Sequence, residues 1–142
     1  MSGHATTRLL QGAAVTVMVS GVIVAGSAYP ATAGVTRFLV DLIFWPIDGQ
    51  QSLDAPETRL LGAVCGGVMA GWGLMLWLVA ARLYPREPAL ARSIILGSVA
   101  VWFVTDSTGS VMAGAPLNAV FNVGFLLAFW LPLRRPAVRA AA

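Results

Sequence analysis

The sequence contains no lysine, a single cysteine and a single histidine, and only 11% of its 142 residues are charged. The histidine, His4, lies in the polar N-terminal stretch, so no apolar segment offers an imidazole to a haem, a copper or zinc ion, or a chlorophyll magnesium. Cys65 has no partner for an intrachain disulfide. We therefore predict neither a metal site nor a cofactor.

Catalytic motifs are also missing from the chain. The sequence has no glycine-rich phosphate loop, no His-Glu-x-x-His motif, no pair of acids within one apolar segment, and no nucleophile with a plausible histidine base. We therefore predict no catalytic residues, and an enzyme ranks last among the functions that we consider.

Apolar residues dominate what is present. They make up 58% of the chain and raise its mean hydropathy to +0.79, which is too apolar for a soluble domain of this size. The composition predicts an all-α integral membrane protein, a four-helix bundle forming one domain over residues 1–142. All nine basic residues are arginines that flank apolar runs. The pI of about 10.0 therefore reflects membrane topology, and we predict the lipid bilayer, and no nucleic acid, as a partner.

Four segments are long and apolar enough, or nearly so, to cross a membrane, which takes about 20 residues. They are residues 9–29, 60–81, 92–113 and 117–133. In the third segment the uncharged run that follows Arg92 ends before Asp106 and is too short to cross. A crossing helix must therefore continue through Asp106 to about Ala113, which places Asp106 inside the membrane.

The arginines predict the orientation of these helices. Seven fall near one side of the membrane, namely Arg8, Arg82, Arg86, Arg92, Arg134, Arg135 and Arg139, whereas Arg37 and Arg59 fall on the other. The excess of basic residues on the cytoplasmic side of membrane proteins predicts cytoplasmic N- and C-termini. An alternative is a signal peptide cleaved after the Ala-Thr-Ala sequence at residues 31–33.

We expect the loop after the first span to contain structure of its own, because it is long for a compact bundle. Residues 35–45 are rich in large apolar side chains, and Arg37 and Asp41 are spaced by four residues. This pattern predicts a helix that lies in the outer interface, with Trp45 at headgroup depth and Pro46 at its end. Other aromatic residues near span ends are expected in the same interfacial belts. They are Tyr29, Tyr84 and Trp130.

The second span is unusually rich in glycine. Gly62 and Gly66, and likewise Gly67 and Gly71, have the four-residue spacing that lets helix backbones approach closely in lipid. The first span carries a matching stripe of small residues, Gly12, Thr16 and Ser20. We expect close packing within the bundle, with an interface to a partner protein or a second copy as the alternative.

The sharpest cluster of polar residues spans the third and fourth segments, which a short turn joins into an antiparallel hairpin. Asp106 and Ser110, and likewise Asn118 and Asn122, are four residues apart, so each pair occupies one helix face. Counting outward from the turn sets Ser110 level with Asn118 and Asp106 level with Asn122. Arg59 can reach this cluster only from the outer edge.

Two interpretations of this cluster remain open. A carboxylate within a span is costly and needs a partner or water. In the first interpretation Asp106 lines a polar pocket and binds a proton, a cation or the polar head of a lipophilic molecule. In the second, Asn122 and the hydroxyl groups satisfy the carboxylate and clasp the hairpin. The phenylalanine stripe of the fourth span is expected to face lipid or to pack. It comprises Phe121, Phe125 and Phe129.

Residues 57–73 carry a family resemblance. Arg59 opens the second span and is followed by the double glycine Gly66-Gly67 and further glycines. This stretch, together with the structured outer loop and the arginine-flanked hairpin, resembles the small four-helix bacterial membrane proteins of the DoxX-like group. The resemblance covers roughly residues 40–133, and it implies a four-helix fold in the bacterial inner (plasma) membrane and no particular reaction.

Two functions follow as hypotheses. The first is an accessory or assembly subunit that packs against larger membrane proteins, because the chain is small and rich in packing glycines. The second is a binder or carrier of a small lipophilic or cationic ligand at the pocket around Asp106.

Overall fold

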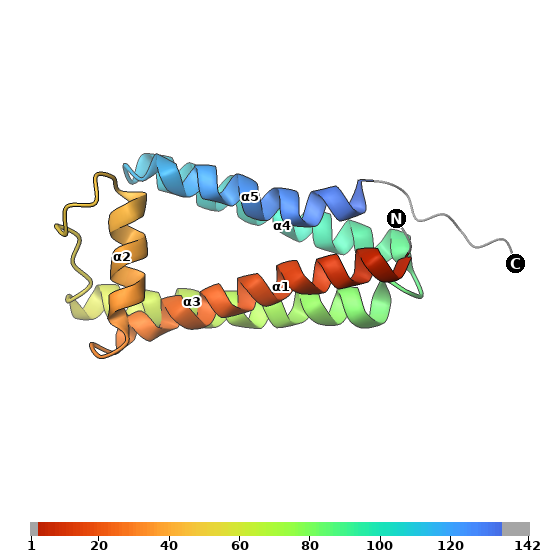
Figure 1. Cartoon of the computed structure of the whole chain (residues 1–142), viewed down its shortest axis with the longest axis horizontal. Helices are drawn as coiled ribbons and strands as arrows, with labels where there is room; N and C mark the ends of the chain where they lie inside the picture. Colours follow the sequence, from red (N-terminus) through yellow and green to blue (C-terminus); the bar gives the residue numbers. More distant parts are fainter. Residues whose placement is uncertain (1–2, 135–142) are drawn as a thin grey trace, which may run out of the picture.

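The computed structural model describes residues 3–134, and every regular element within that range is a helix (Figure 1). The elements are α1 (Gly3–Ala25), η1 (Gly26–Ala28), α2 (Ala33–Ile43), α3 (Pro56–Leu78), η2 (Val79–Leu83), α4 (Pro88–Met112) and α5 (Pro116–Leu133). Four helical stretches in this part of the chain are long and apolar enough to cross a membrane: Gly3–Ala28, Pro56–Leu83, Pro88–Met112 and Pro116–Leu133. The predicted all-α class and the four predicted spans are therefore confirmed at this level. Arg135 and Arg139 lie outside the described residues.

Prolines set the beginnings of three helices. The helices α3, α4 and α5 begin with Pro56, Pro88 and Pro116, respectively. Proline is favoured there because its fixed φ suits a helix and because the first helical N–H has no partner within the helix. These starts extend the predicted spans, and α1 also begins earlier, at Gly3, where the Thr7 hydroxyl donates to the Gly3 carbonyl at 3.1 Å.

The long helices form two antiparallel pairs (Figure 1). In the first pair α1 packs along α3, and in the second α4 packs along α5. The pairs meet through α1 with α5 and through α4 with η2. At the end of the molecule where α1 ends and α5 begins, α2 runs across from η1 toward α5 (Figure 1). The start of α1 and the end of α5 lie at the same end of the molecule.

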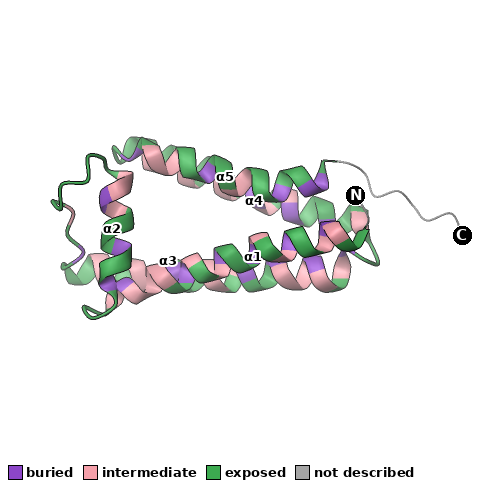
Figure 2. Ribbon diagram, in the orientation of Figure 1, coloured by how far each residue is buried: buried purple, intermediate pink, exposed green. Residues whose placement is uncertain are grey.

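The core lies toward the end of the molecule where the chain begins (Figure 2). Its residues come from α1, from the first half of α4, from the end of α3 with η2 and Tyr84, and from the second half of α5. Its members are Leu10, Ala14, Val17, Leu76, Ala80, Tyr84, Ala91, Ile95, Val99, Phe129 and Leu133. Tyr84 is only 6% exposed and packs in this core, and its predicted position at the depth of the membrane interface stays a prediction. Most other large apolar side chains face outward, as expected of helices that contact lipid.

The α1–α3 contact depends on glycines, although not on all those predicted. A Cβ atom at Gly66 would collide with Ala25 N and Gly21 O, and one at Gly73 would lie 2.6 Å from Met18 N. Gly62 also faces α1, against Ser27. Gly67 and Gly71 have nothing within 4 Å of such an atom. Their predicted packing role within this chain is therefore wrong, because they lie on the exposed side of α3.

The small-residue stripe predicted on the first span also differs. Gly21 is the residue of α1 that meets α3, and a Cβ atom there would lie 2.7 Å from Gly66 O. Gly12 has nothing within 4 Å, whereas Thr16 and Ser20 line a cavity beside α5. The stripe therefore faces the gap between the helix pairs and not α3.

The helix predicted for residues 35–45 is present as α2, with both ends shifted by two residues toward the N-terminus. Arg37 pairs with Asp54 at 3.2 Å and not with Asp41, which lies four residues away on α2. Asp41 is buried and accepts hydrogen bonds from the backbone N–H of Asp48 and Gly49, the latter at 3.0 Å. Asp41 therefore ties the outer loop onto α2.

Candidate functional site

Asp106 lies in the second half of α4 and faces α5. Its Oδ1 accepts hydrogen bonds from Asn122 Nδ2 at 2.7 Å, Asn118 Nδ2 at 2.8 Å and Ser110 Oγ at 3.2 Å. Asn122 is only 4% exposed and also donates to Ser107 Oγ at 3.2 Å. The predicted contact between Asp106 and Asn122 is confirmed. We call these five residues the Asp106 cluster.

The turn between α4 and α5 creates this cluster. Gly114 adopts a φ of +81°, a left-handed conformation that L residues with side chains rarely take. The N–H of Ala115 then donates to the Ser110 carbonyl at 2.8 Å, which closes the end of α4. Because the turn is so short, the helices stay in register, and Asn118 donates to Ser110 Oγ at 2.8 Å. Ser110 therefore lies level with Asn118, and Asp106 with Asn122, as predicted.

Arg59 does not belong to the Asp106 cluster, contrary to the prediction. It occupies the first turn of α3, where its guanidinium lies 3.5 Å from Asp54 Oδ1. Arg37 lies 3.2 Å from the same oxygen. The outer loop carries Asp54 just before α3, beside Arg59, and the main backbone contact of α3 is with α1. Among residues 3–134 Asp106 therefore has no cationic partner.

The second oxygen of Asp106 stays available. No group of the described chain donates a hydrogen bond to Oδ2, although every fully buried side-chain polar atom of these residues has a partner. Oδ2 is thus not sealed in, and Asp106 contributes to the wall of a cavity. The three donors orient the carboxylate through Oδ1 and leave Oδ2 available to a ligand in the cavity.

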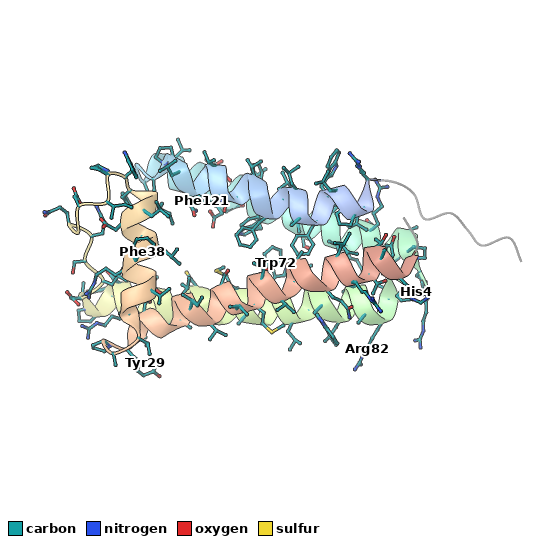
Figure 3. All side chains as sticks on the ribbon, viewed as in Figure 1. His4, Tyr29, Phe38, Trp72, Arg82 and Phe121 are labelled. Carbon is teal, nitrogen blue, oxygen red and sulfur yellow. The ribbon has the colours of Figure 1, made fainter. Side chains whose placement is uncertain are left out.

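The cavity between the helix pairs has a volume of about 630 Å³ and is predominantly apolar. All five α-helices contribute to it, and α2 supplies Leu39, Leu42 and Ile43 at the outer end. Trp72 projects from α3 into the space between the pairs (Figure 3). The helices α4 and α5 supply Trp102, Asp106, Asn118, Phe121, Asn122, Phe125 and Phe129, among others.

Aromatic rings lie beside the carboxylate. Trp102 precedes Asp106 by one helical turn, and its ring centroid lies 5.7 Å from that of Trp72 and 6.0 Å from that of Phe125. The phenylalanine stripe, predicted to face lipid or to pack, also forms part of this wall. Phe129 is 1% exposed and does pack in the core, whereas Phe121 is 44% exposed. The four-residue spacing of Trp102 and Asp106 is the sequence signal that links the aromatic and acidic sides of the site.

Comparisons of the chain with protein-family models, with curated proteins and with solved structures find no match.

Proposed function

We propose that the protein is a membrane-embedded binding protein for a lipophilic ammonium compound. In this proposal the cationic head donates a hydrogen bond to Asp106 Oδ2 and the alkyl portion occupies the cavity. The observation that carries the proposal is an accessible carboxylate oxygen, without a basic partner among the described residues, on the wall of a 630 Å³ apolar cavity.

The charge of the ligand follows from the charge of the site. An ionised carboxylate in a medium of low polarity is stabilised by a cation more than by a neutral donor. The amide and hydroxyl donors of the Asp106 cluster stabilise the carboxylate in part. They do not neutralise its charge, because they carry no net charge. Trp102, one helical turn from Asp106, lies beside Trp72 and Phe125, and the π-electron faces of such rings attract ammonium groups.

The membrane arrangement is part of the same proposal. The four helices form a bundle in a bacterial plasma membrane, as the DoxX-like resemblance implies, with the termini in the cytoplasm and α2 in the outer interface. Exposed Phe38, Phe44 and Trp45 support an interfacial position for α2 and the residues after it. The site around Asp106 then opens nearer the outer leaflet, because α2 lies at the same end of the molecule as the α4–α5 turn (Figure 1).

Binding is tested with a dodecylammonium probe whose chain carries bromine atoms, added to the protein in lipid nanodiscs. Bromine quenches tryptophan on contact, so saturable quenching by the probe reports on Trp72 and Trp102. We expect Asp106→Asn to weaken binding roughly tenfold to a hundredfold, the range for losing a charged hydrogen bond.

The matched control is Asp48→Asn, which removes the same charge from the exposed outer loop. It should bind the probe as the wild type does. Brominated dodecanoate, with the opposite charge, should not saturate. Equal binding by wild type and Asp106→Asn, or saturable binding of the carboxylate probe, would contradict the proposal.

The orientation gives a separate prediction. Reporter fusions after Gln51, in the outer loop, and after Arg139 should report opposite sides of the membrane, with Arg139 cytoplasmic. The same side for both would mean an even number of spans between residues 51 and 139 and would contradict the four-span topology. N-terminal sequencing of the purified protein tests the alternative of cleavage after Ala33 separately.

A role as an accessory subunit is the second candidate, and Gly67 and Gly71 favour it. Their exposed positions on α3 leave a face on which another helix could pack closely. Mild detergent extraction followed by mass spectrometry separates the two functions. Stoichiometric larger subunits that are lost in Gly67→Leu would support the accessory role.

A further inference from the structure

A second cavity lies between α1 and α5, at the end of the molecule opposite the α4–α5 turn. Its volume is about 600 Å³. Leu9 and Leu131 contribute apolar walls, and Gly12 contributes backbone where a side chain would otherwise project. Arg8 and Arg134 lie on the same cavity. The combination is an apolar groove whose lining includes two arginines.

The two arginines carry charge that the described chain does not neutralise. Both are exposed, and neither forms an ion pair with any of residues 3–134. The acidic residue of the described chain at this end, Glu87, lies just before α4 and does not line the groove. Arg92, by contrast, is already engaged, since its Nε donates to the Leu133 carbonyl at 2.8 Å.

We propose that this groove binds one anionic phospholipid from the leaflet at the arginine-rich end. Guanidinium groups match the oxygen geometry of a phosphate diester, so Arg8 and Arg134 would hold the headgroup from α1 and α5. An acyl chain would run along the groove beside Gly12. Such a lipid bridges the two helix pairs where they meet, and its single negative charge offsets part of the positive charge of the two arginines.

The groove favours a lipid over a free anion or a protein segment. A free phosphate would use the two arginines and leave the apolar floor unfilled. A phospholipid uses both parts, and it is the ligand that the surroundings of a membrane helix supply. The position of the arginines at helix ends also matches the depth of lipid headgroups.

Native mass spectrometry of the purified protein tests the proposal, after incubation with equal amounts of phosphatidylglycerol and phosphatidylcholine. We expect one retained phosphatidylglycerol and a clear preference over phosphatidylcholine. Arg8→Gln with Arg134→Gln should remove most of that preference, roughly fivefold for each arginine. Gly12→Leu, which keeps both charges but fills the groove, should lower retention of the lipid.

The control is Arg82→Gln with Arg86→Gln, which removes two exposed arginines from the same end but outside the groove. It should keep the preference, and so should Asp106→Asn, because Asp106 does not line the groove. Equal retention of the two lipids, equal losses in both double variants, or displacement of the lipid by millimolar inorganic phosphate would overturn the proposal. If the Arg8 and Arg134 double variant does not fold, Arg134→Gln alone, after the last turn of α5, decides the question.

Discussion

Replacing Gly66 with leucine is expected to destabilise the protein by about 3 kcal/mol or more, which overpacking of a tight contact can cost. A Cβ atom at Gly66 would already collide with Gly21 O and Ala25 N, and it would lie 2.7 Å from Ala25 Cα. These are backbone atoms, so no side-chain rotation can relieve the overlap. The only relief is to move α1 away from α3, and that separates the largest helix contact of the fold.

The matched control for this substitution is Gly67→Leu. Gly67 is the next residue on the same helix, so the change in composition is identical, yet nothing lies within 4 Å of its would-be Cβ atom. We expect thermal melting in one detergent to show a decrease of roughly 10 °C for Gly66→Leu and little change for Gly67→Leu. Equal decreases for both variants would mean that α3 does not use the face that contains Gly66.

The contrast between these neighbours shows where sequence reasoning fails. Both Gly62–Gly66 and Gly67–Gly71 have the spacing that favours close helix contact, and spacing alone does not tell which face meets a neighbour. The face is indicated by a longer pattern: Gly73 follows Gly66 by seven residues and returns to the same side of the helix. Gly67 is rotated by about 100° from Gly66, away from α1.

The Asp106 cluster could be predicted because its geometry is local. A short turn leaves little freedom in the register of α4 against α5, so counting from the turn places Asn118 and Asn122 correctly opposite Ser110 and Asp106. The prediction that Arg59 joins the Asp106 cluster is wrong, because the position of Arg59 depends on the packing of α3. The long outer loop offers it Asp54, and no pattern within the second span reports that choice.

A pocket at Asp106 is one of the two interpretations that the sequence allows, but its apolar walls could not be predicted, because they arise from how two helix pairs lie against each other. The pairs pack through the core at one end, and α2 lies across the other end (Figures 1 and 2). Trp72 and Phe125 are ordinary apolar positions in their own helices. They become neighbours of Trp102 only when the pairs come together.

The second large effect is expected from Asn122→Leu, which keeps the approximate volume but removes the 2.7 Å donor to Asp106 Oδ1. A buried position and a charged acceptor place this hydrogen bond near the upper end of the values measured between membrane helices, about 1.5 kcal/mol. We expect a lower melting temperature than for Ser98→Ala, a control on the core side of α4 whose hydroxyl bonds only to the Ile95 carbonyl within its own helix.

A double-mutant cycle shows whether this loss belongs to the Asp106–Asn122 pair. Asp106→Leu removes the charge that needs the donor, so adding Asn122→Leu to it should cost much less than Asn122→Leu alone. The expected coupling is about 1.5 kcal/mol, measured as the difference between the summed and the combined losses of stability. Additive losses would show that Asn122 stabilises α5 through some other contact, such as the one with Ser107. A large coupling together with normal folding of Asp106→Asn and its loss of dodecylammonium binding would mean that one carboxylate does two things. Its Oδ1 joins α4 to α5, and its Oδ2 meets the ligand.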